Sequence, residues 1–285
     1  MIVTYHQVYL HMDVQHFFDK DTSTLTYIVF DSETRDAVII DPVLDYNLAT
    51  GKVETHSFKI VTDYLAKHQL RPIYCLETHA HADHLSSAKI IKETYPEIKI
   101  AIGENIKYVQ KAFKDVLNMA PDFKPDGSQF DKLIKDFEEF SAGSIKIRAI
   151  PTPGHTPACM SYHINNMLFC GDALFIEDYG TGRCDFPDGS ADKLFTSIHE
   201  TLYKLPEETI VFVGHDYRPN GRELRCETTI GVSKRQNIHL KESTERSDYV
   251  NFRETRDKTL SPPKLLDQSI KVNINAGVLP EEFKN

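Results

Sequence analysis

The sequence predicts an α/β protein in which two mixed β-sheets pack face to face and helices cover their outer faces. Short apolar, β-branched runs alternate with segments of helical periodicity from residue 25 to residue 213. Asn165-Asn166 separates two apolar runs and suggests a hairpin, and residues 144–150 alternate as a strand with one buried face does. Helices between strands would also allow a doubly wound parallel sheet, but the hairpin and the alternating strand favour the sandwich.

The first half of the chain is expected to contain four strands and three helices. The strands are predicted at 25–30, 37–40, 73–76 and 99–103, where apolar runs end at turn residues such as Asp41-Pro42. The helices are predicted at 58–65, 85–91 and 106–117, where apolar residues recur at intervals of three and four.

The second half repeats this rhythm. Strands are predicted at 144–150, 160–164, 167–170 and 209–213, and a helix at 194–202 with Ser190 as its N-cap. We assign residues 1–240 to one domain and residues 241–285 to a polar C-terminal extension that packs on it. Within the extension, Ser261-Pro262-Pro263 reads as a connector and residues 270–274 as a late edge strand.

Composition excludes several classes of function. The chain has 285 residues, with 33 basic and 42 acidic side chains and a net charge of −9, which argues against a nucleic-acid partner. No apolar run approaches the ~18 residues of a membrane span. The segment Met1–His6 lacks the basic and apolar regions of a signal peptide. Five cysteines without CxxC spacing suggest reduced thiols, so we expect a cytoplasmic protein.

One loop carries the strongest chemical signal. His79, His81, Asp83 and His84 lie within six residues, directly after the apolar run 73–76. Neutral imidazole suits zinc and iron, and carboxylate suits harder ions, so the mixed cluster is a donor set for a transition metal. A polar surface loop is the alternative, and the downstream donors make it less favourable.

Three further donors follow predicted strands. His155 lies in Pro153-Gly154-His155, Asp172 follows Cys170-Gly171, and His215 follows Val213-Gly214. Taken singly, each would be a core histidine or a turn aspartate. Because rigid strand ends that meet at one edge hold ligands in a fixed geometry, the set together with the His79 loop predicts a metal centre.

In these motifs and in their order, the chain resembles the metallo-β-lactamase superfamily over roughly residues 20 to 220. The resemblance implies an αββα sandwich with the metal at one edge, so that residues 1–240 would be the catalytic domain. In binuclear members, seven donors hold two ions: one takes the positions of His79, His81 and His155, the other those of Asp83, His84 and His215, and Asp172 bridges them.

A second segment resembles the persulfide dioxygenase branch of that superfamily. Gly182-Arg183-Cys184-Asp185-Phe186 differs from the glyoxalase II pattern, and His215-Asp216-Tyr217 stands where glyoxalase II has His-Glu-Tyr. Residues 227–229, with Arg235 and Asn237, are similar to a bacterial subgroup of beta-lactamase-like sulfur dioxygenases.

The branch implies one Fe(II) per chain on His79, His155 and Asp172, a facial set that leaves positions open for dioxygen and a sulfur ligand. Two Zn²⁺ ions or a mixed Zn/Fe pair are the alternative. The remaining donors would then hydrogen-bond the ligands and water, or hold a second ion: His81, Asp83, His84 and His215.

The implied reaction converts a glutathione-type persulfide, dioxygen and water to sulfite and the thiol. Arg183 would neutralise a carboxylate or a developing sulfur oxyanion, and Tyr217 would donate a hydrogen bond to the thiol substrate. Arg235 is a further candidate for substrate binding. The expected partner is a small thiol or persulfide, and the expected assembly is a homodimer or a tetramer.

Two alternatives remain open. A thioester hydrolase of the glyoxalase II type (a hydroxyacylglutathione hydrolase) would use metals to lower the pKa of a bridging water. The retained His81, Asp83 and His84 favour it, whereas Asp185-Phe186 counts against it. A non-catalytic metal-binding member of the fold is disfavoured, because such a protein has no need of seven donors.

Overall fold

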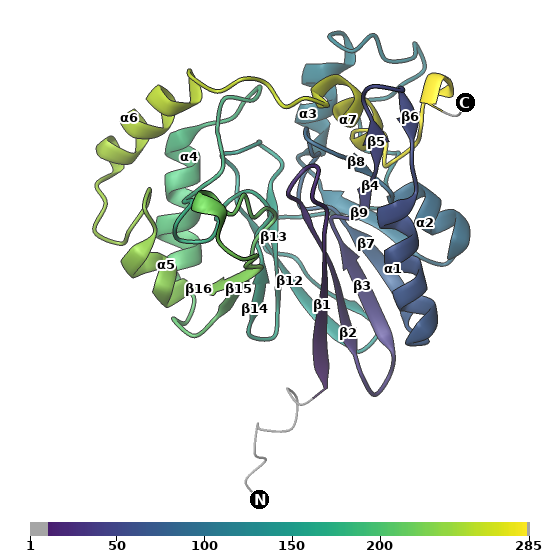
Figure 1. The fold of residues 1–285 in the computed structure, drawn as a ribbon, viewed down its shortest axis with the longest axis horizontal. Helices are drawn as coiled ribbons and strands as arrows, with labels where there is room; N and C mark the ends of the chain where they lie inside the picture. The colour runs from purple at the N-terminus through teal and green to yellow at the C-terminus, as the bar shows by residue number, and fades with distance from the viewer. Residues whose placement is uncertain (1–10, 284–285) are drawn as a thin grey trace, which may run out of the picture.

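Two mixed β-sheets form the centre of the computed structural model, which describes residues 11–283 (Figure 1). Met1–His6, on which the expectation about a signal peptide rests, lies outside the described residues. The first sheet has the order β1 (Met12–Phe18), β2 (Leu25–Asp31), β3 (Asp36–Ile40), β7 (Arg71–Leu76), β9 (Lys99–Gly103) and β10 (Lys132–Ile134). The second has the order β11 (Glu139–Ala142), β12 (Ile145–Pro151), β13 (Met160–Ile164), β14 (Met167–Phe169), β15 (Ile210–Phe212) and β16 (Glu227–Thr229).

Both sheets mix strand directions. In the first, β1, β2 and β3 pair antiparallel, while β3, β7, β9 and β10 pair parallel. In the second sheet, β14 and β15 pair parallel, and the other described pairs are antiparallel. Two short pairs lie beside the first sheet: β4 (Val43–Leu44) with β8 (Leu85–Ser86), and β5 (Tyr46–Asn47) with β6 (Lys52–Val53).

Helices cover the outer face of each sheet. On the first sheet lie α1 (His56–Lys67), α2 (Ala88–Thr94) and α3 (Ile106–Lys114). On the second lie α4 (Ala191–Phe195) and α5 (Ile230–Gln236), and α6 (Arg246–Asp257) packs against α4. The chain then crosses the top of the molecule in Figure 1 to α7 (Leu266–Asn273), which contacts β8, and the short helix η5 (Glu281–Phe283) follows.

The apolar runs in the strands are continuous because both faces of each sheet are buried. Val29 and Val38 pack into the cluster between the two sheets, whereas Ile28 and Ile39 face the helices. Each such side chain contributes about 1.5–3 kcal/mol when it is removed from water. The result is the predicted four-layer sandwich, and the doubly wound alternative is wrong.

Several local predictions are confirmed. Asn165 has a φ of 54° in the turn between β13 and β14, a backbone conformation that asparagine tolerates better than most residues. Ser190 caps α4 by accepting a hydrogen bond from the backbone N–H of Lys193 at 3.2 Å. The five cysteines are all unpaired.

Three local predictions need correction. Residues 270–274 are not an edge strand but lie at the end of α7, because Ser269, Ile270 and Asn273 are buried together at helical spacing. The helix expected at 85–91 begins only at Ala88, since residues 85–86 pair with β4. The helix expected at 194–202 changes from α to π geometry at Thr196.

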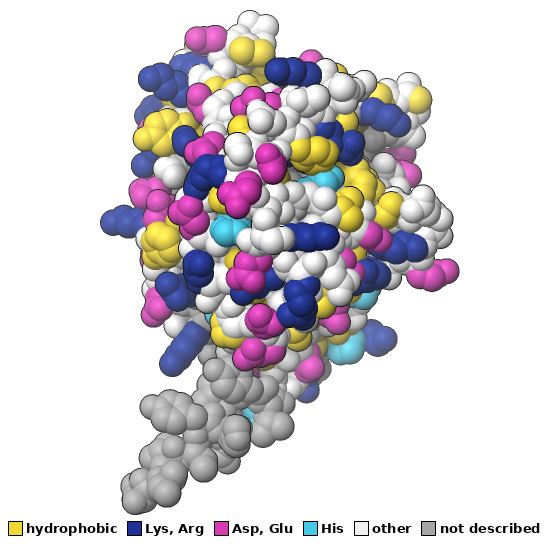
Figure 2. Space-filling view, turned by 90° about the vertical axis from the view of Figure 1, so that its left-hand side faces the viewer, with side chains coloured by type: hydrophobic (Ala, Val, Ile, Leu, Met, Phe, Trp, Pro, Cys, Tyr) yellow, Lys and Arg dark blue, Asp and Glu magenta, His cyan; other side chains and the backbone are white. Residues whose placement is uncertain are grey.

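The surface gives two further findings. On the face seen in Figure 2, basic and acidic side chains are interspersed, so this face carries no continuous basic area. Among residues 11–283, none of the helices combines the length and the apolar character that crossing a membrane requires. The domain boundary at residue 240 remains a prediction.

Candidate metal centre

The predicted donors converge at one edge of the sandwich, where four strands end. The His79–His84 loop follows β7, His155 follows β12, Asp172 follows β14, and His215 follows β15. His79, His155 and Asp172 each offer one ligand atom, and these three atoms lie within 4.8 Å of one another. A second group, His81, Asp83 and His84, meets the same limit. The first group is the set that the resemblance implied for iron, and the second holds three of the four remaining donors, without His215.

The hydrogen bonds of His79 leave one ring nitrogen free for a metal. Thr78 donates its hydroxyl proton to Asp41 Oδ2 at 2.7 Å, so its oxygen accepts from His79 Nδ1 at 3.0 Å. The proton of the neutral ring thus lies on Nδ1. His79 Nε2 is buried and has no hydrogen-bond partner.

His155 and His84 follow the same pattern. His155 Nδ1 lies 2.6 Å from the backbone oxygen of Arg183, and His84 Nδ1 lies 2.9 Å from that of Leu85. Because a carbonyl oxygen only accepts, each ring carries a proton on Nδ1. His155 Nε2 then faces Asp172 Oδ2 at 3.6 Å, and His84 Nε2 is buried without a partner.

Asp172 completes the first group. It is 8 % exposed, and its Oδ1 atom is buried without a hydrogen bond. A buried carboxylate oxygen and unpaired imidazole nitrogens are costly unless a ligand satisfies them. These residues fit a divalent transition metal, which would bind to His79 Nε2, His155 Nε2 and Asp172.

His81 lies between the metal loop and two buried carboxylates. Its Nε2 atom is 3.0 Å from Asp41 Oδ1 and 3.6 Å from Glu77 Oε2, although neither contact has hydrogen-bond alignment. Burial alone would lower the pKa of His81, but these two carboxylates raise it well above its ordinary value. Neither Asp41 nor Glu77 was among the predicted site residues.

His215 and Asp83 are joined through Thr24. The Thr24 hydroxyl donates to Asp83 Oδ2 at 3.1 Å and lies 3.3 Å from His215 Nδ1. His215 Nε2 faces Asp172 Oδ1 at 3.3 Å and Asp83 Oδ2 at 3.5 Å. Burial would lower the pKa of His215, but Asp172 and Asp83 raise it above its ordinary value.

The donors differ in their affinity for protons. The pKa values of His81 and His215 are raised, whereas those of the other titrating donors described here are lowered. Burial raises the pKa of Asp83, but His215 and His84 outweigh it and bring this pKa down to about 2. Burial, with His81 nearby, lowers the pKa of His84 to about 4, and burial also lowers the pKa of His79 and His155. These three imidazoles are therefore neutral at pH 7, as metal ligands must be.

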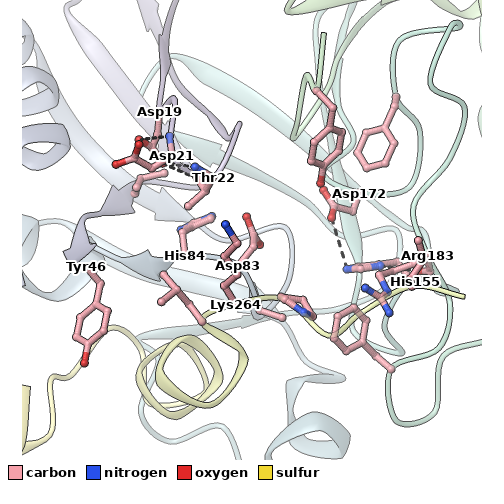
Figure 3. Close-up of a pocket in the computed structure, with 18 of the residues that line it drawn as sticks. Asp19, Asp21, Thr22, Tyr46, Asp83, His84, His155, Asp172, Arg183 and Lys264 are labelled. Atoms are coloured by element: carbon pink, nitrogen blue, oxygen red, sulfur yellow. Dashed lines mark hydrogen bonds and ion pairs between the residues drawn. The ribbon is translucent and has the colours of Figure 1, made fainter. Parts of the chain in front are cut away.

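Two members of each donor group line a cavity of about 720 Å³: His155 and Asp172 of the first, and Asp83 and His84 of the second. Figure 3 shows Asp83 and His84 on one side of it, and His155, Asp172 and Arg183 on the other. Asp19, Asp21, Asp45 and Glu54 also line the cavity, as do Arg256 and Lys264 from the C-terminal extension. The candidate metal ligands thus line one part of the cavity, and both acidic and basic side chains line the rest.

Arg183 lines this cavity but is already paired. Its Nε and Nη2 atoms donate to the two carboxylate oxygens of Asp185, each at 2.6 Å, and Nη1 donates to the Ser261 carbonyl at 2.8 Å. Asp185, which distinguished this chain from glyoxalase II in the sequence, thus holds the guanidinium in place.

Tyr217 is 41 % exposed and lines the cavity. The centroid of its ring lies 4.5 Å from that of Tyr179 and 5.4 Å from that of His215, and both pairs are stacked, so the ring is held beside His215. Its neighbour Asp216 is buried and accepts two hydrogen bonds from Arg222, each at 2.7 Å. Asp216 therefore stabilises the conformation of the loop, and we assign it no role in the reaction.

The expectation for Arg235 needs correction. Arg235 does not line the cavity, and its side chain, 59 % exposed, donates to Glu207 Oε2 at 2.6 Å. It lies on α5, on the outer face of the second sheet. Besides Arg183, three cationic residues line the cavity, Arg253, Arg256 and Lys264. They come from the polar extension and carry no motif that would have revealed them.

Comparison with known proteins identifies the family. The model of the metallo-beta-lactamase superfamily matches residues 20–215. The chain belongs to the metallo-beta-lactamase superfamily. A relative within it, glyoxylase B2 of Dictyostelium discoideum, is 45% identical over 273 residues, which cover 95% of this chain and 93% of the relative.

Persulfide dioxygenases of the superfamily are also similar to this chain. The mitochondrial persulfide dioxygenase ETHE1 of Bos taurus is 29% identical over 93% of this chain and 89% of its own length. The crystal structure of ETHE1 from Myxococcus xanthus has a TM-score of 0.75 and 28% identity, and it covers 94% of this chain and 100% of that one. The superfamily fold binds metal ions, and these relatives indicate an enzyme.

Proposed function

We propose that this chain is a non-haem Fe(II)-dependent persulfide dioxygenase. The reaction would be a glutathione-type persulfide plus dioxygen and water giving the thiol and sulfite, with release of two protons. One observation carries the proposal: His79, His155 and Asp172 form a compact group of two imidazoles and one carboxylate. That donor set is typical of non-haem Fe(II) oxygenases.

Two of the remaining donors already have partners within the protein, and this favours a single ion, bound to the first group. Asp83 already accepts a hydrogen bond from Thr24, and His81 Nε2 faces Asp41 and Glu77. Bound to the first group, Fe(II) would supply the redox chemistry that activates dioxygen, which redox-silent zinc does not supply. The chain's own part is to keep the three donor atoms unprotonated and oriented.

The cavity supports an anionic thiol carrier as the substrate. Arg256 and Lys264 line it and make no ion pair with the described residues. They can pair with the carboxylates of a glutathione-type persulfide, and Asp19, Asp21 and Asp45 on another part of the wall can receive its ammonium group. The volume of about 720 Å³ is within the range for a ligand of that size.

Arg183 and Tyr217 have distinct proposed roles. Because Asp185 compensates the charge of Arg183, the guanidinium would act as an oriented donor at the rim and stabilise negative charge on the sulfur product. Tyr217 would donate a hydrogen bond to the thiol sulfur, since its ring is held beside His215. The likeness to proteins named persulfide dioxygenase supports this reaction.

A thioester hydrolase of the glyoxalase II type is the second candidate. His81, Asp83 and His84 form a second donor group within 4.8 Å, which a binuclear hydrolase would need. The relative named glyoxylase B2, at 45% identity, is also consistent with it. In that enzyme a bridging water of lowered pKa would be the nucleophile.

One experiment separates the two candidates. Protein purified without oxygen is assayed with glutathione persulfide in an oxygen electrode, and with lactoylglutathione for hydrolysis. The proposal predicts oxygen uptake with sulfite formation and negligible hydrolysis. Hydrolysis of lactoylglutathione without oxygen uptake from the persulfide would refute it.

A further inference from the structure

The C-terminal extension contacts the metal-binding loop through one buried side chain. Asn273 of α7 is 5 % exposed, and its Nδ2 atom donates to the backbone oxygens of His81 and His84, each at 2.8 Å. Its Oδ1 atom accepts from the backbone N–H of Ser86, also at 2.8 Å. These three bonds bracket the turn that presents His81, Asp83 and His84.

The same extension contacts the opposite side of the site through α6. Arg253 and Asp257 form a buried ion pair, with Arg253 Nε donating to Asp257 Oδ1 at 2.9 Å. Arg253 Nη1 donates to the Thr181 carbonyl at 3.0 Å, and the Cys184 N–H donates to Asp257 Oδ2 at 2.7 Å. The pair thus holds both ends of the segment 181–184.

That segment touches two members of the proposed iron-binding group. The Arg183 carbonyl accepts the proton of His155 Nδ1 at 2.6 Å. Gly182 lies against Asp172 so closely that an added Cβ would be 2.1 Å from the Asp172 backbone oxygen. A shift of residues 181–184 would therefore turn the His155 ring and displace the Asp172 backbone.

We propose that residues 241–285 position the metal-binding side chains from both sides, with Asn273 and Asp257 as the positioning residues. Neither lines the cavity, so each acts through the backbone that it holds. Outer partners of this kind typically change metal affinity about 10–100-fold when they are lost. This inference depends on the metal centre and not on which reaction the centre performs.

Asn273→Asp tests the first contact. Aspartate has the same shape but donates no hydrogen bond to the two carbonyls. Metal-free protein is titrated with Co²⁺, and the dissociation constant and the visible absorption spectrum are recorded. We expect a dissociation constant raised at least about tenfold and altered absorption bands, with circular dichroism showing a folded chain. Asn275→Asp, the same change two residues along, is the matched control and should match the wild type.

Asp257→Asn tests the second contact and carries the test alone if Asn273→Asp does not fold. It removes the charge that pairs with Arg253 and should also weaken Co²⁺ binding about tenfold. Asp248→Asn, at an exposed position on the same helix, is its control. A Co²⁺ affinity and spectrum equal to those of the wild type, even with a lowered melting temperature, would overturn the proposal. Absence of oxygen uptake by the wild type would instead refute only the proposed function.

Discussion

His155 donates a hydrogen bond from Nδ1 to the backbone oxygen of Arg183 at 2.6 Å. This contact fixes the proton on Nδ1 and turns Nε2 toward Asp172. It also joins two motifs that lie 28 residues apart in the chain. The residue that the sequence suggested for substrate binding, Arg183, therefore also orients a proposed metal ligand through its backbone.

Removing His155 should abolish iron binding at the first group. His155→Ala leaves His79 and Asp172 as donors, so we expect more than about 100-fold weaker iron binding and no measurable oxygen uptake. Metal analysis after anaerobic reconstitution, with the oxygen electrode, checks this. His163→Ala on β13 is the control, because His163 does not line the cavity. Full iron content in His155→Ala would contradict the ligand assignment.

Arg183 and Asp185 should act as one unit. Each single change to alanine breaks the bidentate pair, and we expect each to lower kcat/KM for the persulfide about tenfold, or ~1.4 kcal/mol. The double variant should be little worse than either single variant, because the pair is lost once. Kinetics by oxygen uptake give the comparison, and fully additive losses would show that the two residues act independently.

The cationic wall should affect substrate binding. Arg256→Ala and Lys264→Ala should each raise KM for glutathione persulfide about threefold to fivefold, since partly exposed ion pairs are worth about 1 kcal/mol or less. Iron content should not change. Arg235→Ala should leave KM unaltered, because Arg235 lies outside the cavity and pairs with Glu207. Equal KM values for all three variants and the wild type would remove the support for an anionic carrier.

His84 should make the metal-free protein sensitive to acid. Unfolded His84 has the ordinary pKa of 6.5, whereas burial lowers the folded value to about 4. The unfolded chain therefore binds a proton in this window that the folded chain does not, and stability falls as the pH drops from 6.5 toward 4. The loss attributable to His84 is about 3 kcal/mol.

His84→Gln should remove that part of the pH dependence. Urea unfolding of the metal-free wild type and variant at several pH values between 4 and 7 measures it. The free energies of unfolding should fall less steeply for the variant as the pH decreases. Parallel curves would mean that the folded pKa of His84 is close to its ordinary value.

The strand ends were the predictable part of this molecule. His79, His155, Asp172 and His215 each follow an apolar run, and parallel or neighbouring strands bring such ends to one edge. The same rule would have found Asp41, which ends β3 and accepts from Thr78. In the sequence, Asp41-Pro42 indicates only a turn.

The C-terminal extension was the unpredictable part. Ile270, Val272 and Ile274 alternate with polar residues as in a strand, and only the tertiary burial of Ser269 and Asn273 decides for a helix. Likewise, α6 has few apolar residues, and its buried members include the ion pair of Arg253 and Asp257. Polar residues that pair with distant backbone leave no periodic signal in the sequence.

An iron titration tests the central claim, a single catalytic Fe(II) per chain, most directly. Metal-free protein is titrated with Fe(II) without oxygen, and the rate of oxygen uptake with glutathione persulfide is measured at each ratio, with Zn²⁺ in a parallel series. We predict a rate that reaches its maximum at one iron per chain and stays at background with zinc. A maximum at two metals per chain, or equal rates with zinc, would contradict the account.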